Sequence, residues 1–239
     1  LGLAERDPTM DLDGTDAAHK VCVIASLLSG RWVKPAEVPH EGILRVSAAD
    51  VAFAAGELEC AVRLLGVVEL DWERSRLSAG VRPHLVPVKH PLASVHGEYN
   101  AVLVEASAAG DLMFYGKGAG AGPAASAVVG DVFTLAQEIL GERLAAPVSA
   151  WTTGPRGLPG SAARRFLTED PEEARAGFYL RLLAKDRPGV LARIAGALGR
   201  RGVSIARIHQ EAAASPRSRG NGAWAPVFLT THPASARAM

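Results

Sequence analysis

Two segments near the start of the chain repeat apolar residues at the spacing of an α-helix. From Thr15, which is a fair N-cap, apolar positions return every three or four residues until Gly30 ends the pattern. A second helix is predicted over residues 47–65, because the serine at its start and Asp50 form a variant of the capping box and Gly66 closes the segment.

The next stretch of the chain has the composition and alternation of β-strands. Strands are predicted over residues 67–71, 81–88, 99–106 and 112–115, each rich in β-branched or aromatic residues. A short Ala-Ala-Gly-Asp turn separates the last two, which predicts a hairpin. An apolar helix is then expected over residues 124–140.

Residues 143–176 interrupt this periodicity with several prolines and glycines and a charged run, as linkers do. Order returns with a predicted strand over 178–184, a turn, and a helix over 190–198. Further strands are expected over 202–208 and 227–231. The order β-α-β-β within a short stretch predicts the first half of a ferredoxin-like module.

These elements together predict an α+β protein with a mixed or antiparallel sheet and helices on one face, followed by a truncated ferredoxin-like βαββ module. The expected domains are residues 1–145 and 177–239, with a linker over 146–176. A complete module has a further helix and strand, so we expect residues 211–223 to be a mobile loop and residues 227–231 to be a poorly protected edge strand.

Composition narrows the possible classes of protein. The 239 residues include 26 Lys and Arg against 25 Asp and Glu, a net charge of +1, which argues against nucleic acid or a membrane surface as the main partner. Two cysteines, Cys22 and Cys60, both placed in helical patterns, form neither a disulfide framework nor a four-ligand zinc site, so no metal site is predicted. Without a bilayer-length apolar run or a signal pattern, a soluble cytoplasmic protein is expected.

The acidic segment at the start of the chain carries the first candidate chemistry. Asp16 and Lys20 are four residues apart in the predicted helix and therefore share a face. A carboxylate beside an ammonium orients it and keeps it charged, and such a lysine in a closed cleft passes a proton to a substrate oxygen. The alternative is a solvated ion pair, with Glu5 and Asp11 acting only on the helix dipole.

This segment, Glu5-Arg6-Asp7-Pro8 through Lys20, closely resembles the catalytic signature of homoserine dehydrogenase. The resemblance implies that Lys20 is the acid/base on the substrate's hydroxyl or carbonyl oxygen and that Asp16 binds and orients the substrate. It also implies that Glu5 contacts both the substrate and the cofactor region, and that Asp11 belongs to the same substrate-binding acidic cluster.

A glycine-rich stretch, Gly116 to Pro123, lies between a predicted strand and helix and fits G-x-G-x-x-A. It is not the dinucleotide fingerprint, because an antiparallel hairpin precedes it instead of a parallel βαβ unit. It resembles the homoserine dehydrogenase loop at the cofactor edge of the active site, which implies cofactor contacts at Gly118 and Gly120. Residues 91–102 resemble a substrate-domain strand of the same family, although Asn100 is equally well explained as a polar strand-end residue.

The segment Lys185-Asp186-Arg187-Pro188-Gly189, with Gly202-Val203-Ser204-Ile205 after it, resembles an ACT domain, the amino-acid-sensing module. Backbone amides at a helix start attract a carboxylate. The resemblance therefore implies an effector site at Asp186 and Gly189, with threonine as a possible effector. A plain strand-to-helix turn with Pro188 at the helix start is the alternative.

The resemblance implies NAD(P)-dependent interconversion of L-homoserine and L-aspartate 4-semialdehyde, in the biosynthesis of threonine, methionine and isoleucine, by a homodimer or tetramer. The chain opens on Leu1 and lacks the family's nucleotide-binding domain, so we expect a fragment that is inactive alone. A catalytically inactive fragment that binds an amino acid or dimerises is the alternative.

Overall fold

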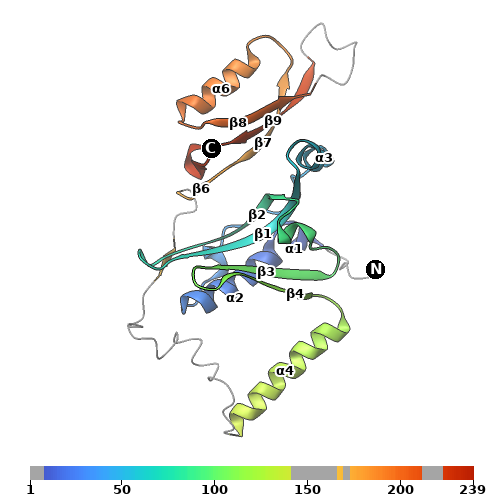
Figure 1. Cartoon of the computed structure of the whole chain (residues 1–239), viewed down its shortest axis with the longest axis vertical. Helices are drawn as coiled ribbons and strands as arrows, with labels where there is room; N and C mark the ends of the chain where they lie inside the picture. The colour runs from blue at the N-terminus through green and yellow to red at the C-terminus, as the bar shows by residue number, and fades with distance from the viewer. Residues whose placement is uncertain (1–7, 141–165, 169–172, 212–222) are drawn as a thin grey trace. The chain divides into compact units, whose positions relative to one another are not determined.

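The computed structural model describes residues 8–140, 166–168, 173–211 and 223–239. The chain divides into two compact units, residues 1–168 and 169–239, which are described separately. Both combine helices with small sheets, so the predicted α+β class is confirmed (Figure 1). Within the described residues, no helix is both long and apolar enough to cross a bilayer.

The first unit begins with two helices joined by a tight turn. The short α1 spans Thr9–Leu12, and α2 spans Thr15–Ser29. Thr15 is the first residue of α2 rather than its N-cap: Gly14 holds the cap position with φ +87°, and the Asp13 carboxylate accepts a hydrogen bond from the Thr15 amide at 2.8 Å. The side-chain cap therefore comes from one residue before the cap position.

The second predicted helix is much shorter than expected. A 3-10 turn, η1 (Pro35–Glu37), precedes α3, which spans only Ala48–Glu57, with the expected capping box at its start. From Cys60 the chain is strand β1 (Cys60–Asp71), so the prediction of helix to residue 65, with Cys60 inside it, was wrong. The short apolar run after Cys60 fits the period of a helix or of a strand, and pairing with the strand that follows it decides between them.

That partner is β2 (Arg76–Pro87), which pairs antiparallel with β1 along its whole length. A short strand, β5 (Leu167–Thr168), adds to the other edge of β2 in parallel, so this sheet is mixed. β5 therefore lies inside residues 146–176, the range predicted to be a linker. A 3-10 turn, η2 (Pro91–Ser94), follows β2.

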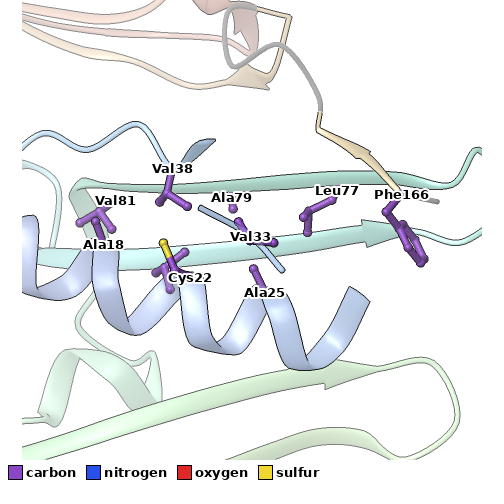
Figure 2. Close-up of a cluster of buried hydrophobic side chains, with 10 residues drawn as sticks. Ala18, Cys22, Ala25, Val33, Val38, Leu77, Ala79, Val81 and Phe166 are labelled. Carbon is purple, nitrogen blue, oxygen red and sulfur yellow. The ribbon is translucent and has the colours of Figure 1, made fainter. Parts of the chain in front are cut away.

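The core of this unit lies between α2 and the β1–β2 sheet. Ala18, Cys22 and Ala25 point from one face of α2 toward residues of β2 (Figure 2). Helix and sheet approach closely at Gly66 of β1, where a β-carbon would overlap the side chain of Val21. Burial of these apolar groups fixes which face of α2 turns inward, and hence which face turns outward.

A hairpin and a helix complete the first unit. Strands β3 (Tyr99–Ala106) and β4 (Gly110–Lys117) pair antiparallel, as predicted, and β4 leads into α4 (Ala121–Ile139) through a glycine turn (Figure 1). Both the hairpin and α4 expose many large apolar side chains. Two strands alone bury little surface, so the described part of the chain leaves this hairpin largely uncovered.

The second unit contains the predicted β-α-β-β order. Strands β7 (Tyr179–Lys185), β8 (Ile205–Gln210) and β9 (Trp224–Thr231) form an antiparallel sheet, and α6 (Val190–Arg200) connects β7 to β8. A second small pairing joins β6 (Arg175–Ala176) to β10 (Ala234–Ser235), before the 3-10 turn η4 (Ala236–Ala238).

The strand order in this sheet is β7-β9-β8. The prediction that residues 227–231 form an exposed edge strand was therefore wrong, because β9 is the central strand and Val227, Phe228 and Leu229 are fully buried. Strand order depends on which chain segments meet across the sheet, and local composition does not report it. Residues 212–222, most of the predicted mobile loop, lie outside the described residues.

Candidate functional site

The ion pair predicted from spacing forms on α2. Lys20 Nζ lies 2.7 Å from Asp16 Oδ2, and their side chains are 61% and 44% exposed. The buried face of α2 carries Ala18, Val21 and Cys22, so the pair points away from the sheet. This position leaves the ammonium accessible while the carboxylate restricts its orientation.

Exposed apolar side chains follow the ion pair along the same face of α2. Val23 and Leu27 follow Lys20 at helical spacing, and both are large apolar side chains exposed in this unit. A solvated ion pair does not need apolar neighbours, whereas a surface covered by another domain or subunit does. The outer face of α2 therefore has the character of a surface that another domain or subunit covers.

The acidic turn before α2 is held by a contact that the sequence did not reveal. Gly42 lies so close to the backbone of Leu12 and Asp13 that a β-carbon there would overlap both, and the Ile43 amide donates to Leu12 O at 2.8 Å. Gly42 thus positions the turn that begins α2. In the sequence, Gly42 is a glycine between Glu41 and Ile43, and this pattern is too common to predict the contact.

The other predicted acidic residues are not brought into this pair. Asp11 lies on the exposed side of α1, and among the contacts of the described residues none joins it to Asp16 or Lys20. Glu5 lies outside the described residues. Their roles stay predictions based on the resemblance.

The glycine-rich turn lies between β4 and α4. The Gly118 amide donates to Glu98 O at 2.9 Å, and a β-carbon on Gly118 would overlap the Asn100 side chain. Gly120 has φ +111°, a conformation that favours glycine, and Ala121 begins α4 directly after it. Asn100 is thus placed against the turn, which explains why no side chain fits at Gly118.

Charge and aromatic contacts brace the same end of the hairpin. Lys117 Nζ lies 2.9 Å from Glu98 Oε1 and 5.7 Å from the centre of the Tyr99 ring, which stacks on Tyr115. The Lys117 hydrogen bond lowers the pKa of Glu98, and the same bond raises the pKa of Lys117. The turn therefore follows a strand end that carries both an ion pair and a stacked pair of rings.

In the second unit, the Asp186–Gly189 turn joins β7 to α6. Gly189 is the N-cap of α6 with φ +85°, so the helix begins at Val190, two residues later than a start at Pro188 would place it. The Asp186 carboxylate accepts a hydrogen bond from Gln210 Nε2 at 3.0 Å, and its amide donates to Ala223 O at 2.8 Å. Gln210, at the end of β8, is a neighbour of this turn that sequence reasoning missed.

Metal-ligand groups are the remaining candidate chemistry. Across the described ranges of the chain, no group of three or more His, Cys, Asp or Glu side chains has the placement to hold a metal ion. Both cysteines are free, and burial raises the pKa of each thiol. The Asp16–Lys20 pair, the glycine turn and the Asp186 turn therefore remain as candidate sites.

The chain is thus a two-unit α+β protein, with an acid–lysine pair on the first unit and a βαββ order in the second, and sequence comparison identifies its family. Residues 1–133 match the family model for homoserine dehydrogenase, and residues 178–217 match that for the ACT domain. The chain belongs to the homoserine dehydrogenase family.

Curated relatives agree with this assignment. Homoserine dehydrogenase of Mycobacterium tuberculosis is 40% identical over 243 residues, covering 100% of this chain and 52% of the relative. The enzyme of Corynebacterium glutamicum is 41% identical over 216 residues, covering 88% of this chain and 45% of the relative. The chain thus spans about half the length of the curated relatives it matches.

Solved structures match the fold as well. A homoserine dehydrogenase from Thiobacillus denitrificans has a TM-score of 0.78 at 31% identity, covering 98% of this chain and 50% of that one. A homoserine dehydrogenase from S. aureus, solved at pH 7.5, has a TM-score of 0.64 at 27% identity, covering 97% and 51% respectively.

Proposed function

We propose that this chain supplies the substrate-binding, catalytic and dimerisation part of an NAD(P)-dependent homoserine dehydrogenase, together with its ACT module. The reaction is the reversible conversion of L-homoserine to L-aspartate 4-semialdehyde, in the cytoplasmic biosynthesis of threonine, methionine and isoleucine. The observation that carries this proposal is the Asp16–Lys20 pair, 2.7 Å apart, on the outer face of α2. It lies within the residues that match the family.

Lys20 is the general acid/base in this proposal. In the oxidation direction its neutral amine accepts the proton of the substrate hydroxyl, and in the reduction direction its ammonium returns a proton to the forming oxygen. Asp16 holds the Lys20 head group and keeps it directed at one place. Asp11 on α1 adds a carboxylate just before α2, which suits the ammonium group of an amino-acid substrate, and the resemblance assigns Glu5 to the same substrate.

NAD(P), when bound, supplies the hydride chemistry that the side chains of this chain lack. The glycine turn fits a contact with the edge of a dinucleotide, because Gly118 and Gly120 expose backbone at the start of α4. The described residues contain no parallel βαβ unit that would hold the whole cofactor. These residues would therefore line the cofactor's edge, and a separate nucleotide-binding part would hold it.

The exposed surface of α2 also supports a separate nucleotide-binding part that packs against this chain. A nucleotide-binding part that covers Val23 and Leu27 would remove water from around Lys20 and enclose the substrate. A proton transferred in such a closed cleft is not lost to solvent. The exposed apolar side chains and the ion pair thus have one common explanation.

The second unit would regulate this activity. The amides at the start of α6 and the carboxylate of Asp186 suit the two charged ends of a free amino acid, such as threonine. Gln210 adds an amide group beside Asp186. A ligand there competes with the Gln210 contact, so binding would change the connection between β8 and the turn.

Joining the chain to the remaining part of a relative such as the M. tuberculosis enzyme tests the proposed function. We expect this joined enzyme to oxidise homoserine with NAD(P), and Lys20→Ala to lower kcat by about 10²-fold or more, because a general acid/base is lost. KM for homoserine changes less. Reduced-cofactor absorbance measures both.

Lys89→Ala is the matched control, because Lys89 is an exposed lysine outside α2. It should leave kcat unchanged. A joined enzyme with Lys20→Ala that keeps near-normal kcat would show that the proton comes from elsewhere. A parent enzyme that folds and binds cofactor but leaves homoserine unchanged would refute the proposed function.

A further inference from the structure

Residues 166–168, the last residues of the first unit, are inserted into the structure that holds α2. Phe166 is only 3% exposed and belongs to the same buried cluster as Ala25 and Leu77 (Figure 2). Its ring meets that of Trp72 edge to face, with centres 5.0 Å apart and planes at 85°. A residue far along the chain thus closes one end of the α2 core.

The backbone of the same segment is fixed to β2. Leu167 and Thr168 pair in parallel with Arg76 and Leu77, and the Leu167 amide donates to Ser75 O at 2.9 Å. A strand of two residues gains little from pairing alone. The segment is therefore attached mainly through the side chains on either side of Leu167.

Thr168 closes a polar clamp at the C-terminal end of α2. Arg31, just after the glycine that ends the helix, donates to Thr168 Oγ1 at 2.6 Å and to Glu37 Oε2 at 2.9 Å. The Thr168 hydroxyl donates in turn to Glu37 Oε2 at 3.0 Å. Arg31 and Glu37 are six residues apart, and the clamp joins them to Thr168, which lies 131 residues beyond Glu37.

The clamp is not fully satisfied as it stands. Arg31 Nε is buried and has no hydrogen-bond partner among the described residues. A buried donor without a partner favours any state that returns it to water. Short pairing, one aromatic anchor and this unsatisfied donor together describe a contact that can open without unfolding the sheet.

The two ends of α2 belong to one uninterrupted helix. Lys20 lies about 14 Å along the helix axis from Ser29, the last helical residue, so a shift or loosening at one end reaches the other. From Thr168 the covalent chain continues directly into the second unit, which starts at Glu169. The segment is thus the end of the first unit, and it is fixed against the helix that bears Lys20.

We propose that residues 166–168 are a latch: docked, they order α2 and position Lys20, and released, they loosen the helix and lower the reactivity of Lys20. The role of Lys20 rests on the proposed function, whereas the ordering of α2 does not. Phe166, Thr168 and Arg31 are positioning residues in this scheme, because they act through the helix and not on the substrate.

Hydrogen exchange on the 239-residue chain tests the latch directly. Thr168→Val keeps the shape of the side chain and removes the clamp hydroxyl, while Phe166→Ala removes the aromatic anchor. We expect the amides of residues 22–29 to exchange roughly tenfold faster in each variant, through local opening. Exchange in β1 and in β7–β9 should be unchanged.

Two matched variants control for generic effects. Thr134→Val removes a hydroxyl that bonds within its own helix, Trp224→Ala removes an exposed ring of the second unit, and neither should affect α2. Unchanged exchange at residues 22–29 in Thr168→Val would overturn the latch, as would equal acceleration throughout the first unit. If Phe166→Ala does not fold, Phe166→Leu replaces it and is judged by the same criteria.

The joined enzyme gives the functional readout. Thr168→Val should lower kcat about tenfold or more, with a smaller change in KM, since misplacement of a catalytic group affects the chemical step. Faster exchange with unchanged kcat would overturn the positioning of Lys20. An inactive parent enzyme would instead refute the proposed function, and the exchange result would still decide whether α2 depends on the latch.

Discussion

At the scale of single residues, Gly66 sets how closely α2 approaches the sheet. A β-carbon at this position in β1 would overlap the Val21 side chain, which is buried beneath the helix. Lys20 directly precedes Val21 in α2, so the absence of a side chain at Gly66 contributes to where the ammonium lies. Packed interiors transmit such changes because they contain little free space.

Gly66→Ala is therefore expected to destabilise the first unit by about 1–3 kcal/mol, the usual cost of overpacking a core. Gly116→Ala is the control, since Gly116 also lies in a strand but a β-carbon there meets nothing within 4 Å. Denaturant unfolding followed by tryptophan fluorescence measures both. Equal stability of the two variants would show that α2 has room to shift.

The residues of the candidate sites differ in how well the sequence alone predicts their contacts. Asp16 and Lys20 were predictable as neighbours, because four-residue spacing on a helix fixes a contact locally. Gly42 and Gln210 were not, because their partners lie about thirty and about twenty-four residues away across the fold. Long-range contacts of this kind leave no periodic trace in the sequence.

At the scale of elements, Glu37 connects η1, the end of α2 and β5. The Lys34 amide first, and then the Arg31 guanidinium and the Thr168 hydroxyl, hold the pKa of the Glu37 carboxyl below its ordinary value, against the opposing effect of burial. A carboxyl with a lowered pKa in the folded state stabilises that state above its ordinary pKa. This stabilisation is lost as the pH falls through the lowered value.

We therefore expect the first unit to lose stability as the pH falls from about 5 toward about 3, and part of this loss to come from Glu37. Glu37→Gln should be less stable than the parent at neutral pH and should show a smaller decrease over the same range. Thermal unfolding at a series of pH values gives both slopes. Parallel curves for parent and variant would exclude Glu37 as a contributor.

Elements were predictable where their own residues decide the structure. The hairpin strand over residues 99–106 matches because alternation and a tight turn are local signals. The helix expected to residue 65 failed because the apolar run after Cys60 fits two periods, and pairing with β2 chooses between them. The central position of β9 was not predictable from its own residues either, because it depends on pairing with both β7 and β8.

At the scale of the whole molecule, the first unit exposes more apolar surface than a self-sufficient domain does. Val102 and Leu112 on the hairpin and Val132 and Phe133 on α4 are all exposed. Both faces of the hairpin carry apolar residues, whereas a sheet open to water on one side alternates apolar and polar positions. Such surfaces mark contacts with other domains or subunits.

The hairpin is the surface best suited to a second copy of the chain. Phe114 is 64% exposed and pairs across the strands with Val102, so a partner hairpin would cover an apolar ridge and add strands to a marginal two-stranded sheet. We expect the chain to sediment as a dimer at micromolar concentration and Phe114→Glu to shift it toward monomer, because a charge would be buried in the interface. Val88→Glu, at an exposed apolar residue outside the hairpin, should leave the dimer intact. A monomeric parent chain, or a Phe114→Glu variant that dimerises as the parent does, would rule out the hairpin as the interface.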